Sequence, residues 1–176
     1  MSRLISREDA VRVLRRAGCS DNVIQHAMVV EKVALLIAKK ISANGHHVDI
    51  DFVGAGALLH DIGRSRGHGI GHGVEGGKIL RELGLEKFVC VAERHVGAGI
   101  PAGEAVALGL PRRDFIPRTL EEKIITYADK LVMGGRKISY SRALDWFKSE
   151  LGAEHPAIER FKHLHSELKG LMEKKQ

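Results

Sequence analysis

The sequence of 176 residues predicts a single all-α domain, for three reasons. Apolar residues recur at steps of three and four, as at Val30, Val33 and Ile37, which is the spacing of one helix face. No segment shows the clean alternation of apolar and polar residues that marks a half-buried strand. The chain is 44% hydrophobic but only 5% aromatic, so its core must be built mainly from Val, Ile, Leu and Ala, which favours packed helices.

The predicted helices begin at recognisable N-cap residues, namely Ser6, Asp49 or Asp51, and Thr119. Two stretches rich in glycine interrupt the helical spacing. The string GRSRGHGIGHG is expected to be an irregular surface loop, and GAGIPAGEAVALGLPRRDFIPR a long excursion rather than a helix. Helices are therefore expected over about 7–17, 21–43, 49–61, 72–83, 86–95, 119–133, 141–150 and 156–174.

Composition and charge narrow the class of protein. No apolar run approaches the roughly 18 residues of a membrane span, and the start MSRLISREDAVRVLRR is too charged for a secretory signal, so we expect a cytoplasmic protein with no membrane partner. Cys19 and Cys90 lack CxxC spacing, which argues against disulfides and a zinc ribbon. The net charge of +6 and pI near 9.5 favour an anionic partner. Because aromatic residues do not alternate with the basic ones, a small phosphorylated molecule is favoured over a nucleic acid. The oligomeric state is not predicted.

Several metal-ligating side chains stand where an apolar helix stripe should continue. His26 lies one turn before Val30, the pair His60-Asp61 ends a stripe, and Asp129 lies between Ile125 and Val132. His72 and His95 continue two further stripes. A buried carboxylate must be paired, neutralised or bound to a metal, so this recurrence favours a metal site.

Each of these residues also has a structural interpretation. A single histidine on an apolar face is more often a hydrogen-bonded core residue than a ligand. Asp129 alone can equally be a salt-bridge partner of Arg94 or Lys130. The pattern GxGxxG at Gly71, Gly73 and Gly76 does not predict a dinucleotide site, because no strand precedes it.

The order His26, HDIG at His60-Asp61 and YADK at Asp129 resembles the HD-domain superfamily of metal-dependent phosphohydrolases. The strings HGVEGG at His72, ERHVG at His95 and GGR at Arg136 make the resemblance more specific. Together these strings resemble the motifs of the subgroup whose members hold two metals with six ligands. This subgroup includes bacterial hydrolases that split diadenosine tetraphosphate symmetrically. The closest overall resemblance is to archaeal HDIG-domain proteins.

The resemblance implies a helical bundle of the HD-domain type over residues 1–176, with a metal core at about 22–136 and C-terminal helices at 141–174. It implies that His26, His60, Asp61 and Asp129 hold one metal, and that Asp61 bridges to a second held by His72 and His95. Asp61 and His60 would also be the catalytic residues. Imidazole and carboxylate donors suit Fe, Mn or Zn, with Mg or Ni as alternatives.

Three further residues are expected to bind the substrate phosphate. Arg64 matches a basic position of an HDIxK pattern, and Arg136 matches the basic residue that ends the ADK helix; an ordinary surface role is the alternative for both. His68 lies four residues before His72 and competes with it for the second metal, although His72 is preferred.

The expected activity is hydrolysis of a phosphate ester or anhydride of a nucleotide-type substrate by a metal-activated water. Two alternatives remain open. One is a dinuclear-iron oxygenase of HD-like fold, and the other is a nucleotide sensor without catalysis. The loop from Gly99 to Arg118 has no counterpart in the resemblance, so substrate specificity cannot be transferred.

Overall fold

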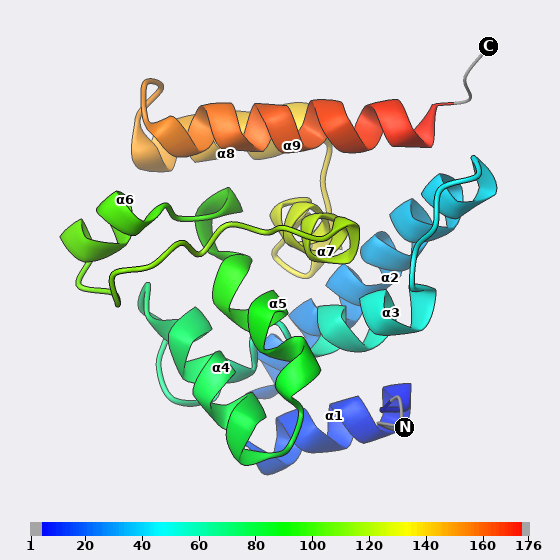
Figure 1. The fold of residues 1–176 in the computed structure, drawn as a ribbon, viewed down its shortest axis with the longest axis vertical. Helices are drawn as coiled ribbons and strands as arrows, with labels where there is room; N and C mark the ends of the chain where they lie inside the picture. The colour runs from blue at the N-terminus through cyan, green and yellow to red at the C-terminus, as the bar shows by residue number, and fades with distance from the viewer. Residues whose placement is uncertain (1–4, 174–176) are drawn as a thin grey trace.

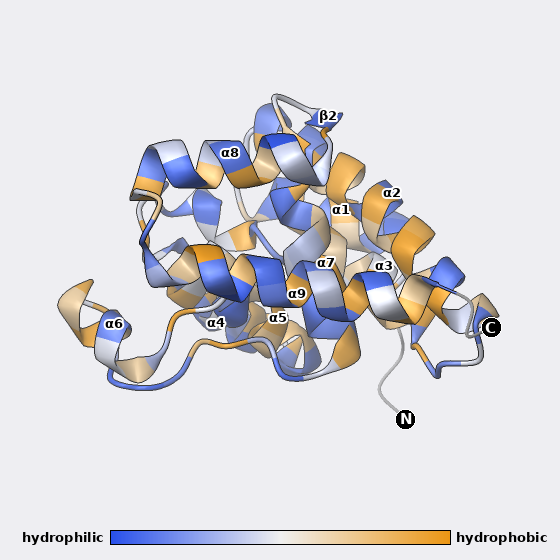
Figure 2. Cartoon of the chain, turned by 90° about the horizontal axis from the view of Figure 1, so that it is seen from above, coloured by the Kyte–Doolittle hydropathy of each residue, from blue (hydrophilic) through white to orange (hydrophobic). Residues whose placement is uncertain are grey.

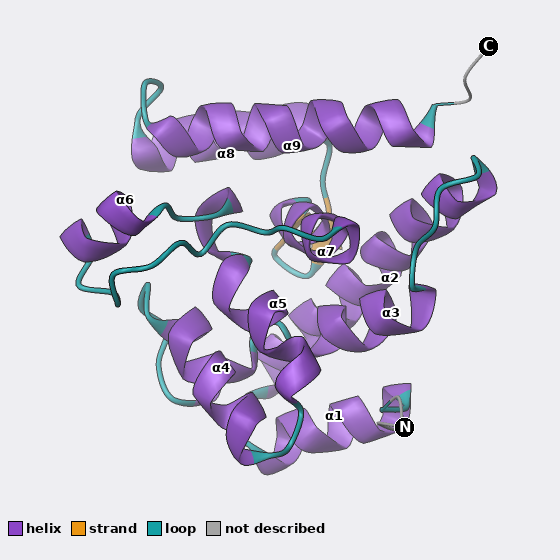
Figure 3. Ribbon diagram, in the orientation of Figure 1, coloured by secondary structure: helices purple, strands orange, loops and turns teal. Residues whose placement is uncertain are grey.

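The computed structural model describes residues 5–173, and its regular structure is almost entirely helical, as the sequence predicts (Figures 1 and 3). Residues 1–4 and 174–176, including Lys174 at the end of the last expected helix, lie outside the described range. No helix within 5–173 is long and apolar enough to cross a membrane. The helices are α1 Arg7–Arg16, α2 Asp21–Ala43, α3 Ile50–Leu59, α4 His72–Glu82, α5 Val89–Arg94, α6 Ala102–Ala107, α7 Leu120–Lys130, α8 Tyr140–Leu151 and α9 Pro156–Met172, with 3-10 turns η1 Ile62–Ser65, η2 Glu86–Phe88 and η3 Val96–Ala98.

Side-chain caps set the starts of the main helices. The hydroxyls of Ser6, Ser20, Thr119 and Ser139 each accept a hydrogen bond from a backbone N–H in the first turn, as does the carboxylate of Asp49 for α3. These bonds satisfy N–H groups that have no partner within the helix. Asp49, rather than Asp51, is therefore the cap of the third helix.

The long helix α2 runs through the centre of the molecule and packs against α3 and α7. Its inward face contributes Val30, Val33, Ile37 and Ile41 to the largest core cluster, as the helical spacing predicts. Helices α8 and α9 lie side by side across one end of the molecule, and α1 lies at the other (Figure 1). Hydrophilic and hydrophobic segments alternate along α8 and α9, as expected for amphipathic helices that cover a core (Figure 2).

Three segments differ from the prediction, the first of them at the end of α7. Helix α7 ends at Lys130 instead of near 133, because Val132–Met133 (β1) pairs antiparallel with Arg136–Lys137 (β2). The two intervening residues, Gly134 and Gly135, both have positive φ, which suits a tight hairpin turn. This small hairpin, rather than a longer helix, carries the chain away from Asp129.

The excursion over 97–118 contains a helix that the sequence analysis did not predict. Helix α6 begins after Pro101, and its first N–H donates to the carboxylate of Asp114. An isolated β-bridge joins Ile100 to Phe115, and Arg113 pairs with the buried Glu93 of α5. The excursion is therefore fastened to the side of the bundle.

The glycine-rich loop also begins with a regular turn that the sequence analysis did not predict. The turn η1 packs directly on α4, and a Cβ at Gly63 would lie 1.9 Å from the backbone oxygen of His72. On the other side of α4, a Cβ at Gly73 would lie 2.8 Å from the backbone oxygen of Ala92 in α5. Glycines thus allow three segments that carry candidate ligands to approach closely.

Candidate metal centre

The structure brings all six predicted ligands together, from five separate segments. His26 comes from the inward face of α2, and Asp129 from the last turn of α7. The other four stand at helix ends: His60 and Asp61 follow α3, His72 begins α4, and His95 follows α5. A helix end can direct a side chain into the centre without interrupting the apolar stripe that packs the helix.

Asp61 lies in the middle of the group. Its Oδ1 is 3.2 Å from Nε2 of His72 and 3.3 Å from Nε2 of His95. Its Oδ2 is 3.6 Å from Nε2 of His60 and 3.8 Å from Nε2 of His26. The two oxygens of one carboxylate therefore face two different pairs of imidazoles.

Asp129 supplies the second carboxylate. Its Oδ1 lies 2.9 Å from Nε2 of His26 and 3.4 Å from Nε2 of His60. The ligand atoms of His26, His60 and Asp129 lie close enough together to hold a metal ion, and so do those of His60, Asp61 and His95. The donor atoms are thus arranged as two overlapping groups.

Backbone hydrogen bonds determine which imidazole nitrogens face this centre. Nδ1 of His60 donates to the carbonyl of Ala57, Nδ1 of His72 to that of Gly69, and Nδ1 of His95 to that of Ala92. A carbonyl can only accept, so the neutral form of each ring has its lone pair on Nε2, which is the atom that points to the centre. This arrangement orients imidazoles for metal ligation.

Several of these atoms lack the partner that burial requires. Nε2 of His60 and Oδ1 of Asp61 are buried without a hydrogen-bond partner among the described residues. Nε2 of His72 and Nε2 of His95 lie 3.1 Å apart, so two neutral rings would set their lone pairs against each other. Divalent cations between these atoms would satisfy all of them, so the donor set fits a metal centre.

The pKa values of the buried groups follow from the same crowding. Burial opposes ionisation of Asp61, but its neighbours, first among them the positive charge of His60, outweigh burial and hold the pKa of Asp61 well below the usual range. For Asp129, burial is likewise outweighed, first by Lys130 and then by His26 and His60, so its pKa is also lowered. Burial lowers the pKa of His95 to about 4, which keeps its Nε2 unprotonated at neutral pH. For His60, burial is overcome by Asp61 and Asp129, and the pKa is raised.

The expected phosphate-binding residues are placed differently from one another. Nε of Arg64 donates to Oδ2 of Asp61 at 2.7 Å, so this guanidinium lies directly at the centre. His68 is exposed and lines a small cleft of about 230 Å³ together with His26, Asp61 and Arg64. Arg136 is exposed in β2, opposite Met133 in the hairpin, and no described contact joins it to the six ligands.

Lys130 is a further cation at the centre, and the sequence analysis did not assign it to substrate binding. Its ammonium pairs with Oδ2 of Asp129, which is the salt bridge considered there as an alternative, whereas Arg94 pairs with Glu122. Its position directly after Asp129 in the string YADK is the sequence signal that could have identified it. Lys130 and Arg64 thus place a positive charge beside each carboxylate of the centre.

A larger cleft of about 340 Å³ opens beside the centre. His26, Asp129, Arg64 and Lys130 line it. The remaining lining residues are mainly apolar and form a wall contributed by the glycine-rich loop, η3, the β1 strand and α8; they are Ile70, Val96, Gly97, Val132, Met133, Trp146, Phe147, Glu150 and Leu151. The sequence analysis did not identify this apolar wall, because α8 is remote from the ligand motifs along the chain.

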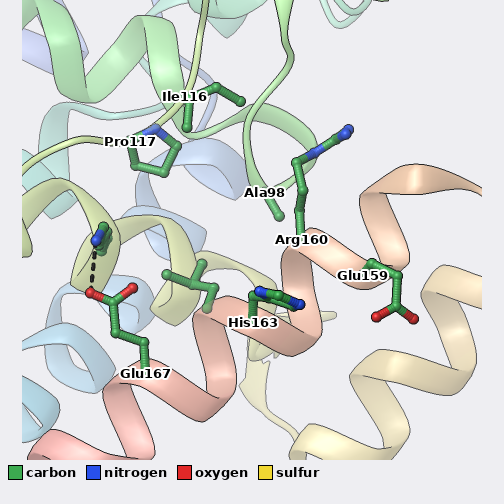
Figure 4. A pocket seen from close by; sticks show the side chains of 9 residues that line it. Ala98, Ile116, Pro117, Glu159, Arg160, His163 and Glu167 are labelled. Atoms are coloured by element: carbon green, nitrogen blue, oxygen red, sulfur yellow. Dashed lines mark hydrogen bonds and ion pairs between the residues drawn. The ribbon is translucent and has the colours of Figure 1, made fainter.

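A separate cleft of about 270 Å³ lies between α9 and the segment around Pro117 (Figure 4). None of the six ligands lines it. Both of its long cations are already paired: Arg160 with Glu104 of α6, and Lys123 with Glu167, the ion pair drawn in Figure 4. Within the excursion, residues 99–118 contribute to this cleft and to neither of the two clefts at the centre, whereas Gly97 lines the larger one.

The fold and the ligand set define the class of protein. The family model of the HD domain matches residues 23–134, a stretch that includes all six ligands. The chain therefore belongs to the HD domain family, and its helical bundle is of the HD-domain type.

Relatives of the chain extend the comparison. It is 46% identical over 166 residues to an uncharacterized protein of Methanocaldococcus jannaschii, covering 94% of this chain and 98% of the relative. It is 43% identical over 154 residues to a tRNA (cytidine(56)-2'-O)-methyltransferase of Thermoplasma volcanium, covering 87% of this chain. The chain thus spans nearly all of the first relative but only 44% of the methyltransferase.

Among solved structures, the HD domain of the L. monocytogenes phosphodiesterase PgpH shares this fold. The TM-score is 0.53 at 16% identity, and the match covers 93% of this chain and 99% of the PgpH domain. At this identity the likeness concerns the fold alone.

Proposed function

We propose that this chain is a metal-dependent phosphohydrolase that cleaves a phosphate ester or anhydride of a nucleotide-type substrate. One observation carries the proposal: four imidazole nitrogens and two carboxylates converge in a centre where the buried Nε2 of His60 and Oδ1 of Asp61 have no hydrogen-bond partner among the described residues. Membership of the HD domain family supports hydrolase chemistry. The proposed ligands are His26, His60, Asp61 and Asp129 for one metal ion, and Asp61, His72 and His95 for a second.

When bound, the metal ions would supply a Lewis acid for phosphate oxygens and a water of lowered pKa for attack on phosphorus. The chain's own residues have separate tasks. Asp61 and Asp129 stay ionised at neutral pH because their pKa values are lowered, so they present full negative charges to the cations. Arg64 and Lys130 lie beside these carboxylates and bind the substrate phosphate by charge-assisted hydrogen bonds.

The first test combines metal analysis with phosphate release. The purified protein is expected to hold about two transition-metal ions per chain, and to release phosphate from at least one member of a panel of dinucleoside polyphosphates, cyclic nucleotides and nucleoside monophosphates. RNA fragments belong in the panel because a similar protein is a tRNA methyltransferase by name. The panel should be repeated with Mn²⁺, Fe²⁺, Zn²⁺, Mg²⁺ and Ni²⁺.

Asp61→Asn should lower the hydrolysis rate by at least about 100-fold and remove most of the metal, because both proposed metal positions lose a charged ligand. His95→Ala should lower the metal content from two ions towards one. His163→Ala is the matched control, since this histidine is exposed on α9 and lines the separate cleft. Circular dichroism should show that the variants are folded. Full activity with two ions in His95→Ala would contradict the proposed ligand set.

The same measurements separate the proposal from its alternatives. Retained iron with visible absorption and no phosphate release from any ester would favour an oxygenase. Tight nucleotide binding without turnover after metals are restored would favour a sensor.

A further inference from the structure

The larger cleft beside the metal centre has an unusual concentration of exposed apolar side chains. Ile70 is 43% exposed, Trp146 45% and Leu151 42%, and all three line this one cleft. Exposed apolar side chains that gather at one place often mark a binding site, whereas single ones scattered over a surface do not. Within residues 5–173, the other exposed large apolar residues are Leu36, Leu83, Val106 and Leu108, and none of them lines it.

The cleft combines charged and apolar lining residues. Arg64 and Lys130 line it beside the candidate ligands His26 and Asp129, and the exposed apolar side chains line the same cleft. A ligand that carries both an anionic group and an apolar group would match this lining. Its volume of about 340 Å³ is in the range of small-molecule sites, which begins at roughly 300 Å³.

Two features of the apolar wall favour a flat heterocycle over an alkyl chain. Trp146 offers an indole ring, a good stacking partner for a base. Glu150 lines the same cleft, and its exposed carboxylate can accept hydrogen bonds from ring N–H or amino groups. An alkyl chain has no donor for such a bond.

We propose that Trp146 and the neighbouring apolar wall bind the nucleobase of the substrate, with Glu150 accepting from the base, while the phosphate lies at the metal centre. This inference rests on the proposed function, to which it adds a specificity-determining element. That element is α8, which lies outside the 23–134 stretch matched by the family model. Base recognition is therefore assigned to a part of the chain that the ligand motifs do not reach.

The first experiment uses the fact that the chain has one tryptophan. With metals restored, the full chain is titrated with nucleoside 5'-phosphonates, whose C–P bond resists hydrolysis, and with methylphosphonate. Saturable quenching of Trp146 emission by the nucleoside phosphonates, but not by methylphosphonate, is the expected result. No quenching by any nucleoside phosphonate would overturn the inference, as would equal quenching by an alkyl phosphonate. Tighter quenching by an RNA fragment with a terminal phosphate would assign the cleft to RNA and also overturn it.

The second experiment measures specificity. Trp146→Ala should lower the ratio of kcat/KM for a nucleotide to kcat/KM for methyl phosphate by roughly 10-fold, mainly through KM, because base–aromatic stacking is lost. Trp146→Phe should restore most of the ratio. Leu108→Ala is the matched control, since Leu108 is 46% exposed on the surface but lies outside the cleft.

The outcomes distinguish this inference from the proposed function. If phosphate is released but Trp146→Ala leaves the ratio unchanged, the hydrolase assignment stands and the base site is wrong. If no phosphate is released from any substrate but the nucleoside phosphonates quench Trp146, the base site stands and the hydrolase assignment is wrong.

Discussion

Two cations of the chain itself already neutralise the carboxylates of the centre. Arg64 donates to Asp61 at 2.7 Å, and Lys130 pairs with Asp129. Little of either carboxylate is exposed, and an unpaired buried charge would cost several kcal/mol. The two pairs therefore offset part of this cost in the metal-free chain.

His95 should make the stability of the metal-free protein depend on pH. Burial lowers its pKa to about 4, whereas an unfolded histidine has a pKa of about 6.5. Between these values the unfolded chain binds more protons than the folded one, so the free energy of unfolding decreases as pH falls from 6.5 to 4. The full effect is about 3 kcal/mol.

The free energy of unfolding can be measured by urea denaturation in the presence of a chelator at pH 6.5 and pH 4.5. Between these pH values it should decrease less for His95→Gln than for the natural protein. The comparison cancels the opposite contribution of His60, whose pKa is raised. Equal losses in the two proteins would contradict the burial argument.

At the scale of elements, the contact between η1 and α4 sets the position of Asp61 relative to His72. It depends on Gly63, where a Cβ would lie 1.9 Å from the backbone oxygen of His72 and 2.4 Å from the backbone nitrogen of Gly76. Both neighbours are backbone atoms, which cannot rotate away as a side chain can. The ligand geometry is therefore sensitive to one methyl group.

Gly63→Ala should destabilise the protein by about 3 kcal/mol, the upper part of the range for overpacking, because η1 must separate from α4. It should also lower metal content, since Asp61 and His72 move apart. Gly67→Ala is the matched control: it lies in the same loop, and a Cβ there would meet nothing within 4 Å. Thermal denaturation and metal analysis of both variants would test this, and similar values for the two would count against it.

The sequence predicted the elements whose signals are local. The helix over 21–43 was predicted with its observed bounds, because its apolar spacing is regular. The hairpin after Lys130 was missed because its strands have two residues each, too few to show alternation. Helix α6 was missed because one turn and a half among prolines and glycines has little periodicity.

For the site, the strings HDIG, YADK, HGVEGG and ERHVG, together with the helix-stripe position of His26, identified the six residues that the structure brings together. The apolar wall could not be predicted in the same way. Trp146 and Ile70 come from segments far apart in the chain, and neither has a motif. Their proximity depends on how α8 packs across the bundle, and local sequence patterns do not predict such tertiary packing.

At the scale of the whole molecule, the centre joins five segments that otherwise contact one another mainly through apolar packing. Ligands that bind only the folded state stabilise it by mass action. A chelator should therefore lower the midpoint of thermal unfolding by roughly 10 °C, since 1 kcal/mol corresponds to about 2–4 °C for a chain of this size. Asp61→Asn should show little chelator effect, and an equal shift in both proteins would mean that the chelated ion binds elsewhere.

The contact between His26 and Asp129 joins residues 103 positions apart in the chain. During synthesis, a nascent polypeptide that stops before α7 has the imidazole but not its acidic partner. The proposed first metal position would therefore be complete only after most of the chain has been synthesised. Loading of that position would accordingly follow the synthesis of α7.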